Sequence, residues 1–167
     1  MDEEPVRRVG GCSVSILYVY DDGGRKAAGF KGGAGDCAAR AIAIATGLPY
    51  RQVYDGLNAI AKTERFRGKR KGKSSNARTG VYVETVHTYL VGELGWRWTP
   101  YMHIGSGCTK HVRQDELPTG RLVLNLSRHF AAVIDGTLHD TYDCSREGSR
   151  CVYGVWQPPL DDSDYPD

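Results

Sequence analysis

The pattern of hydrophobic and polar positions divides the chain into a helical first half and a strand-like second half. An alanine-rich run begins at Cys37 and closes at Gly47, which predicts a short helix with Asp36 at its N-cap. A second helix is expected over residues 50–62, after Pro49, because valine, leucine and isoleucine recur there at helical spacing. The two helices should form an αα-hairpin.

A third helix is expected over residues 80–93, where helical spacing resumes until Gly95. Its buried side should carry Val83, Val86 and Leu90. The sequence thus predicts three helices before the strand-rich half begins.

Runs of β-branched and aromatic residues predict the strands. A strand or hairpin is expected at residues 13–20, directly before the turn signal at 21–24. Asp135-Gly136 is typical of a tight turn between two later strands. The later strands are expected at WRWTPYM (96–102), RLVLNLS (121–127), HFAAVID (129–135), TLHDTY (137–142) and VYGVW (152–156). Helices followed by an antiparallel sheet predict an α+β fold.

The composition fits one globular domain, because 40% of the 167 residues are hydrophobic and 25% are charged. We expect this domain to span residues 1–160, with a basic surface loop at about 62–79 and an acidic, disordered tail at 161–167. The net charge of +2 excludes function classes that depend on a strong overall field. Charge should therefore matter only locally.

The basic loop is the strongest local concentration of charge. Residues 62–78 hold eight basic side chains and one acid, a local charge of +7. The positions best suited to contact phosphate are Lys69, Arg70, Lys71 and Lys73. Apart from Phe66 the loop lacks interleaved aromatic residues, so a solvated loop is favoured over a nucleic-acid site.

The N-terminal sequence MDEEPVRRVGG lacks an apolar signal core, and no stretch approaches the roughly 20 apolar residues of a membrane span. We therefore expect a cytoplasmic protein with no membrane partner. Five cysteines without secretory context favour reduced thiols over a disulfide framework.

A structural zinc site is the one metal centre that the sequence suggests. Its four ligands would be Cys108, His111, Cys144 and Cys151. The six residues between the last two cysteines exceed the usual spacing, so separate thiols are favoured and no cofactor is expected.

Cys37 is the candidate nucleophile. It lies at a predicted helix N-terminus, where free N–H groups and the helix dipole favour a thiolate and could stabilise an oxyanion. The glycines before it would let a substrate backbone approach closely. The charge of Asp36 would oppose ionisation of the thiol unless that carboxylate is engaged in capping.

His129 is the candidate base among five histidines, because it begins a predicted strand next to a tight turn. If Ile134 pairs with Thr137, His129 opposes Tyr142, and Asp140 lies diagonally on the same face. Asp140 is therefore the candidate for orienting the imidazole.

Two blocks, GFKGGAGDCAARAIAIATG and GRLVLNLSRHFAAVIDGTLHDTYD, resemble a family of small uncharacterised bacterial and phage proteins. Their order of cysteine on a helix, then histidine and aspartate on strands, is similar to the papain-like cysteine peptidase superfamily. This resemblance implies a papain-like fold, with N-terminal helices packed on a C-terminal antiparallel sheet. It also implies thiol attack on an amide, ester or isopeptide bond by Cys37, His129 and Asp140.

The oxyanion glutamine of papain-like enzymes is missing at its usual place, since the sixth residue before Cys37 is Lys31. Lys31, Gly35 and Asp36 mark the expected oxyanion and substrate vicinity, with the backbone N–H of Cys37 as one donor.

The sequence leaves two classes of function open. The first is a thiol hydrolase, or an acyl transferase using the same residues, that acts on a peptide or protein. The second is a non-catalytic phage or prophage protein that binds a host protein or nucleic acid through the basic loop.

Overall fold

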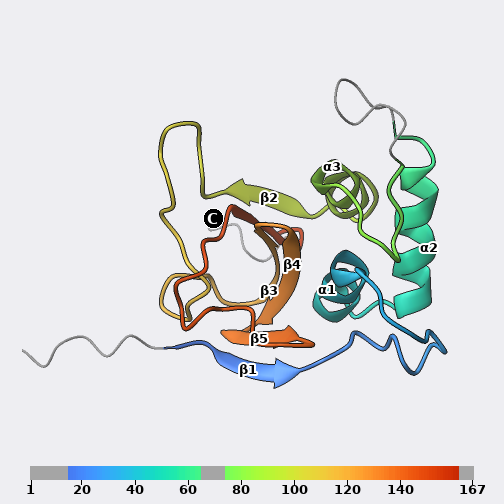
Figure 1. Ribbon diagram of the computed structural model, residues 1–167. Helices are drawn as coiled ribbons and strands as arrows, with labels where there is room; N and C mark the ends of the chain where they lie inside the picture. Colours follow the sequence, from blue (N-terminus) through green and yellow to red (C-terminus); the bar gives the residue numbers. More distant parts are fainter. Residues whose placement is uncertain (1–14, 65–73, 162–167) are drawn as a thin grey trace, which may run out of the picture.

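The computed structural model describes residues 15–64 and 74–161. Within these ranges, three helices pack against one six-stranded sheet, so the protein is a mixed α+β fold (Figure 1). The first helix, α1, lies between the sheet and the second helix, α2 (Figure 1). None of the helices in the described ranges is long and apolar enough to cross a membrane.

Helix α1 spans Cys37–Thr46, as the alanine-rich run predicts. Gly47 ends it with a φ of 74°, and its N–H donates to the Ala43 carbonyl at 2.9 Å. A left-handed residue at this position favours glycine, which explains the end of the helix. Asp36 is the N-cap residue, as predicted, but its side chain makes no cap hydrogen bond and is buried in contacts with other side chains instead.

Helix α2 spans Tyr50–Ala61, and Pro49 precedes it as the N-cap residue. Val53 and Leu57 are fully buried, as their spacing predicts. Their side chains pack against α1 in one hydrophobic core, and the αα-hairpin is confirmed.

The third helix begins as α3 at Val83–His87 and continues as a π-helix, η2, over Thr88–Glu93. Val86 and Leu90 are fully buried, as predicted. The prediction for Val83 is wrong, since 40% of this residue is exposed. It is the first residue of the helix and lines a pocket rather than the core.

The sheet has the order β1-β5-β4-β3-β6-β2. Its strands are β1 (Leu17–Tyr20), β2 (Arg97–Pro100), β3 (Arg121–Leu126), β4 (His129–Ile134), β5 (Thr137–Asp140) and β6 (Gly154–Gln157). The five later strands pair antiparallel, but β1 pairs parallel to β5. The prediction of a purely antiparallel, C-terminal sheet is therefore wrong. The sheet is mixed and has an N-terminal strand at its edge, because the chain between β1 and β5 returns through the helical layer.

The turn between β4 and β5 fixes the register of both strands. Asp135 and Gly136 have φ values of 46° and 77°, as a tight hairpin turn requires. Ile134 pairs with Thr137, which is the predicted register.

The sheet is covered on both faces. On one face Val123, Ala132 and Trp156 belong to the core shared with the helices. On the other face Leu122 and Leu124 pack with residues from the long connections after β2 and β5. Because both faces of the sheet are buried, side chains that must reach solvent can lie only at the ends of strands such as β4 and β5.

Two of the expected features fall on residues outside the described ranges. The basic side chains of Lys69, Arg70, Lys71 and Lys73 lie in the gap at 65–73. The acidic tail lies outside as well, except for Asp161, which is exposed.

The expectation of only reduced thiols is wrong for one pair. Cys108 and Cys151 form a disulfide, and Cys37 and Cys144 are free. The pair arises because an isolated β-bridge places the segment around His111 beside Cys151. The resulting Cα separation of 5.9 Å suits a disulfide.

Candidate active site

The three predicted side chains sit at the ends of three elements. Cys37 is the first residue of α1, His129 the first of β4 and Asp140 the last of β5. Arg128, with a φ of 55°, makes the tight turn from β3 that lets Leu126 pair with His129. Each side chain is therefore positioned by a helix or strand end rather than by a free loop.

His129 contacts both other members of the group. Its Nε2 atom lies 2.6 Å from Oδ2 of Asp140, in a buried contact. Its imidazole also lies close enough to the half-buried Cys37 thiol to lower the pKa of that thiol. The ring lies beside Tyr142, with 5.3 Å between the ring centroids, as the register predicts. The structure thus brings Cys37, His129 and Asp140 together.

The electrostatics of the pair favour a thiolate next to an imidazolium. Burial raises the pKa of the Cys37 thiol, but the hydrogen bond and charge of His129, the Phe130 backbone and the charge of Arg40 together lower it below 9.0. Burial lowers the pKa of His129, but hydrogen bonds to Asp140, Cys144 and Cys37 raise it to about 11. Such a pair provides a nucleophile and a proton donor at neutral pH.

Asp36 does not oppose the thiolate, because its negative charge is compensated by other groups. Only 1% of Asp36 is exposed. Arg25 lies 3.1 Å from its carboxylate, Arg40 forms a second ion pair with it, and the Tyr50 hydroxyl donates to it. Burial and the contact with Asp36 raise the pKa of Tyr50, so this hydroxyl remains a donor.

Arg40 connects this buried cluster to the candidate site. Its guanidinium pairs with Asp36 and also lies 3.8 Å from Asp140. Asp36 and Arg40 are four residues apart on one turn of helix, a spacing at which opposite charges meet. This spacing could have identified Arg40 from the sequence, but its contact with Asp140 depends on the tertiary fold.

A pocket of about 590 Å³ opens over the pair. Cys37 and His129 line it from α1 and β4, and the segment before α3 forms the opposite wall. The other lining residues are Ala34, Gly35, Arg40, Thr79, Gly80, Val81, Tyr82, Val83, Glu84, Asn125, Leu126, Arg128, Phe130 and Tyr142. A substrate can therefore reach the thiol from solvent.

Of the residues expected near an oxyanion, only Gly35 lines this pocket. Its N–H donates to the Arg78 carbonyl at 2.7 Å. A Cβ at Gly35 would lie 2.8 Å from the Thr79 carbonyl oxygen, so only glycine allows this close approach. Lys31 and Asp36 instead line a neighbouring pocket, so neither of them lines the pocket over the thiol. The chain bends at Gly32, which has a φ of 77°, between Lys31 and the start of α1.

Cys144 is a further member of the group that the sequence did not indicate. It is 1% exposed and hydrogen-bonds His129. Each of the side chains of His129, Asp140 and Cys144 offers one atom that could bind a metal, and these three atoms lie within 4.8 Å of one another. The four-ligand zinc set that the cysteine spacing disfavoured, Cys108, His111, Cys144 and Cys151, is not assembled in this structure, because Cys144 lies beside His129 and Cys108 and Cys151 form a disulfide.

Comparison of the chain with protein-family models, with curated proteins and with solved structures finds no match. Any functional conclusion consequently depends on the geometry of the site itself.

Proposed function

We propose that the protein is a thiol hydrolase of the cysteine peptidase type, with a papain-like arrangement, that cleaves an amide or isopeptide bond. The observation that carries the proposal is the position of His129, which contacts the Cys37 thiol and the Asp140 carboxylate. A nucleophile, a base and an orienting carboxylate in this order are what acyl transfer through a thioester requires.

The reaction would begin with attack of the Cys37 thiolate on the substrate carbonyl carbon. A C–S bond forms, and the carbonyl oxygen takes the negative charge. The N–H groups at the start of α1, including that of Cys37, are the candidate donors to this oxygen. The His129 imidazolium then gives its proton to the leaving amine as the C–N bond breaks.

Hydrolysis would complete the cycle. Water attacks the thioester carbon and loses its proton to His129, and the C–S bond breaks to release the acid and restore the thiolate. Asp140 keeps the imidazole oriented through both steps, since it holds Nε2 at 2.6 Å. The other ring nitrogen is then the one left to exchange protons with the substrate.

The pocket supports an extended peptide as the substrate. Ala34, Gly35 and Gly80 line the pocket together, and small residues let a peptide backbone lie close. Arg128 and Glu84 add opposite charges to the pocket lining. These features favour a peptide or protein over an apolar small molecule.

Acylation of the protein by an activated ester tests the proposal. With p-nitrophenyl acetate, intact-mass analysis should show one acetyl group on Cys37 and release of nitrophenol that continues beyond one equivalent. Cys37→Ala should abolish both, because none of the other described residues that line the pocket carries a thiol. Cys144→Ala is the comparison variant: it removes the free thiol that contacts His129 but does not line the pocket, so the acetyl group should still be found on Cys37 even where the rate changes. Equal acylation of the Cys37→Ala variant would contradict the proposal.

A further inference from the structure

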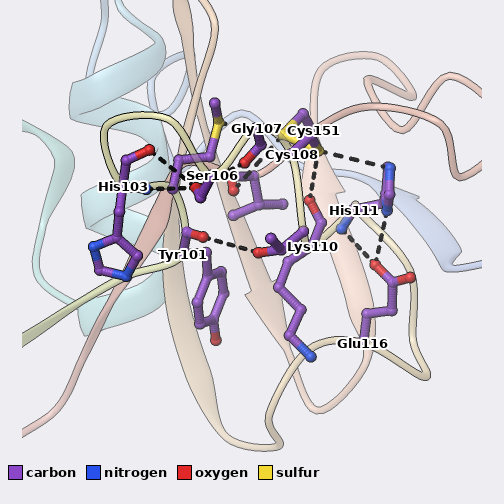
Figure 2. The surroundings of a disulfide bond; sticks show 12 residues. Tyr101, His103, Ser106, Gly107, Cys108, Lys110, His111, Glu116 and Cys151 are labelled. Atoms are coloured by element: carbon purple, nitrogen blue, oxygen red, sulfur yellow. Dashed lines mark hydrogen bonds and ion pairs between the residues drawn. A yellow bond between two sulfur atoms is a disulfide. The ribbon is translucent and has the colours of Figure 1, made fainter.

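A second cluster of sulfur and nitrogen atoms lies in the connections between β2 and β3 and before β6. Figure 2 shows His111 beside the Cys108–Cys151 disulfide, with Glu116 on its other side. Nε2 of His111 lies 3.6 Å from Sγ of Cys108. Nδ1 of His111 lies 3.0 Å from Oε2 of Glu116. The imidazole therefore presents one nitrogen to the sulfurs while a carboxylate holds the other.

The backbone holds these side chains together independently of the disulfide. His111 and Cys151 face each other in an antiparallel β-bridge. The Val112 N–H donates to the Arg150 carbonyl at 2.9 Å, and the Val152 N–H donates to the Lys110 carbonyl at 2.8 Å. Val112 and Val152 are fully buried in the core under the sheet. The two segments should stay paired when the disulfide is reduced.

The donor set and its spacing suit zinc. Tetrahedral Zn²⁺ binds thiolate at about 2.3 Å and imidazole at about 2.0 Å, which places those sulfur and nitrogen atoms about 3.6 Å apart. Cys108 and His111 already have this separation. Imidazoles that bind zinc commonly donate their second N–H to a carboxylate, the position that Glu116 occupies here.

We propose that the reduced form of this cluster binds one Zn²⁺ through Cys108, His111 and Cys151, and that the disulfide is its metal-free, oxidised form. A phosphine supplies the two electrons that break the S–S bond and is itself oxidised to the phosphine oxide, while water supplies the oxide's oxygen and the two protons of the resulting thiols. Zinc binding then releases both thiol protons. Cys108 is exposed, so reductant and metal can reach the cluster, and water completes the fourth coordination position.

Metal titration of the full chain in its two redox forms tests the proposal without any substitution. After reduction with a phosphine, the protein should take up one equivalent of Zn²⁺, measured by elemental analysis after removal of loosely bound metal. Co²⁺ in its place should give a thiolate-to-metal charge-transfer band and the intense visible bands of a tetrahedral site. The untreated, disulfide-bonded protein should bind neither ion at this site. Equal uptake by both redox forms, or no uptake by the reduced form, would overturn the proposal.

Variants locate the metal. Cys151→Ser should weaken metal binding and reduce the charge-transfer band, and the Cys108→Ser/Cys151→Ser double variant should abolish it. Glu116→Gln should weaken zinc binding about 10- to 100-fold with little change in fold by circular dichroism. Cys144→Ser is the control and should bind zinc as the wild type does, because Cys144 lies beside His129 instead. Loss of zinc in Cys144→Ser, with retention in Cys151→Ser, would place the metal at His129, Asp140 and Cys144 and reject the proposed cluster.

Discussion

In the His129→Gln variant, iodoacetamide should alkylate the Cys37 thiol about tenfold more slowly than in the wild type near pH 6. An unperturbed thiol is below about 1% ionised at that pH, whereas contact with an imidazolium keeps the Cys37 thiolate present. The lower intrinsic nucleophilicity of a low-pKa thiolate offsets part of this gain, so the rate difference is smaller than the ratio of the ionised fractions. Iodoacetamide labelling read by peptide mass spectrometry measures the rate at each free cysteine.

His139→Gln is the matched control for this experiment. His139 lies on β5 and also pairs with an aspartate, because its Nδ1 atom is 3.2 Å from Oδ2 of Asp21. It does not line the pocket over Cys37. Its loss should leave the alkylation rate of Cys37 unchanged. Equal slowing in both variants, or no slowing in His129→Gln, would show that the thiol does not depend on His129.

Of the substitutions proposed for this protein, replacement of Asp36 should lower the free energy of unfolding the most. Asp36→Ala removes the buried carboxylate that compensates Arg25 and Arg40, whose side chains are 17% and 12% exposed. Leaving buried charges without their partner costs about 3 kcal/mol or more in the free energy of unfolding. For a domain of this size, that loss lowers the melting temperature by about 10 °C.

Thermal unfolding followed by circular dichroism measures this effect. Asp55→Ala is the control, since Asp55 is an exposed aspartate on α2 and its loss should change the melting temperature by no more than about 2 °C. If Asp36→Ala and Asp55→Ala both melt within about 2 °C of the wild type, Arg25 and Arg40 need no buried counter-ion and the prediction is wrong.

Local sequence patterns were sufficient for the helices and for the hairpin that brings His129 to Asp140. The alanine run predicts α1, and Asp135-Gly136 predicts the turn that sets the register of β4 and β5. These features depend on interactions between residues near in sequence, so short-range rules describe them well.

Features that depend on tertiary packing were not predictable in the same way. The parallel pairing of β1 with β5 joins strands about 120 residues apart, and no local pattern specifies it. Asp36 was expected to cap a helix, but Arg25 and Tyr50 reach it from outside α1. The position of Cys144 beside His129 likewise follows from the path of the chain after β5.

The proposed hydrolase site and the proposed zinc cluster use different residues, so an experiment can reject either proposal without affecting the other. Cys37 and Cys144 contact His129, whereas Cys108 and Cys151 lie with His111 on the connections around β2 and β6. Zinc binding by the reduced protein says nothing about acylation of Cys37, and an inactive Cys37 leaves the metal proposal intact.

Direct titration of the Cys37 thiolate tests the central claim most closely. The ultraviolet absorbance of thiolate, taken as the difference between wild type and Cys37→Ser across about pH 5 to 9, reports the ionisation of this one group. Because His129 lowers the pKa of Cys37, the midpoint of the difference signal should lie below the ordinary pKa of a cysteine thiol. A midpoint at or above that ordinary value would contradict a thiolate–imidazolium pair and with it the proposed hydrolase.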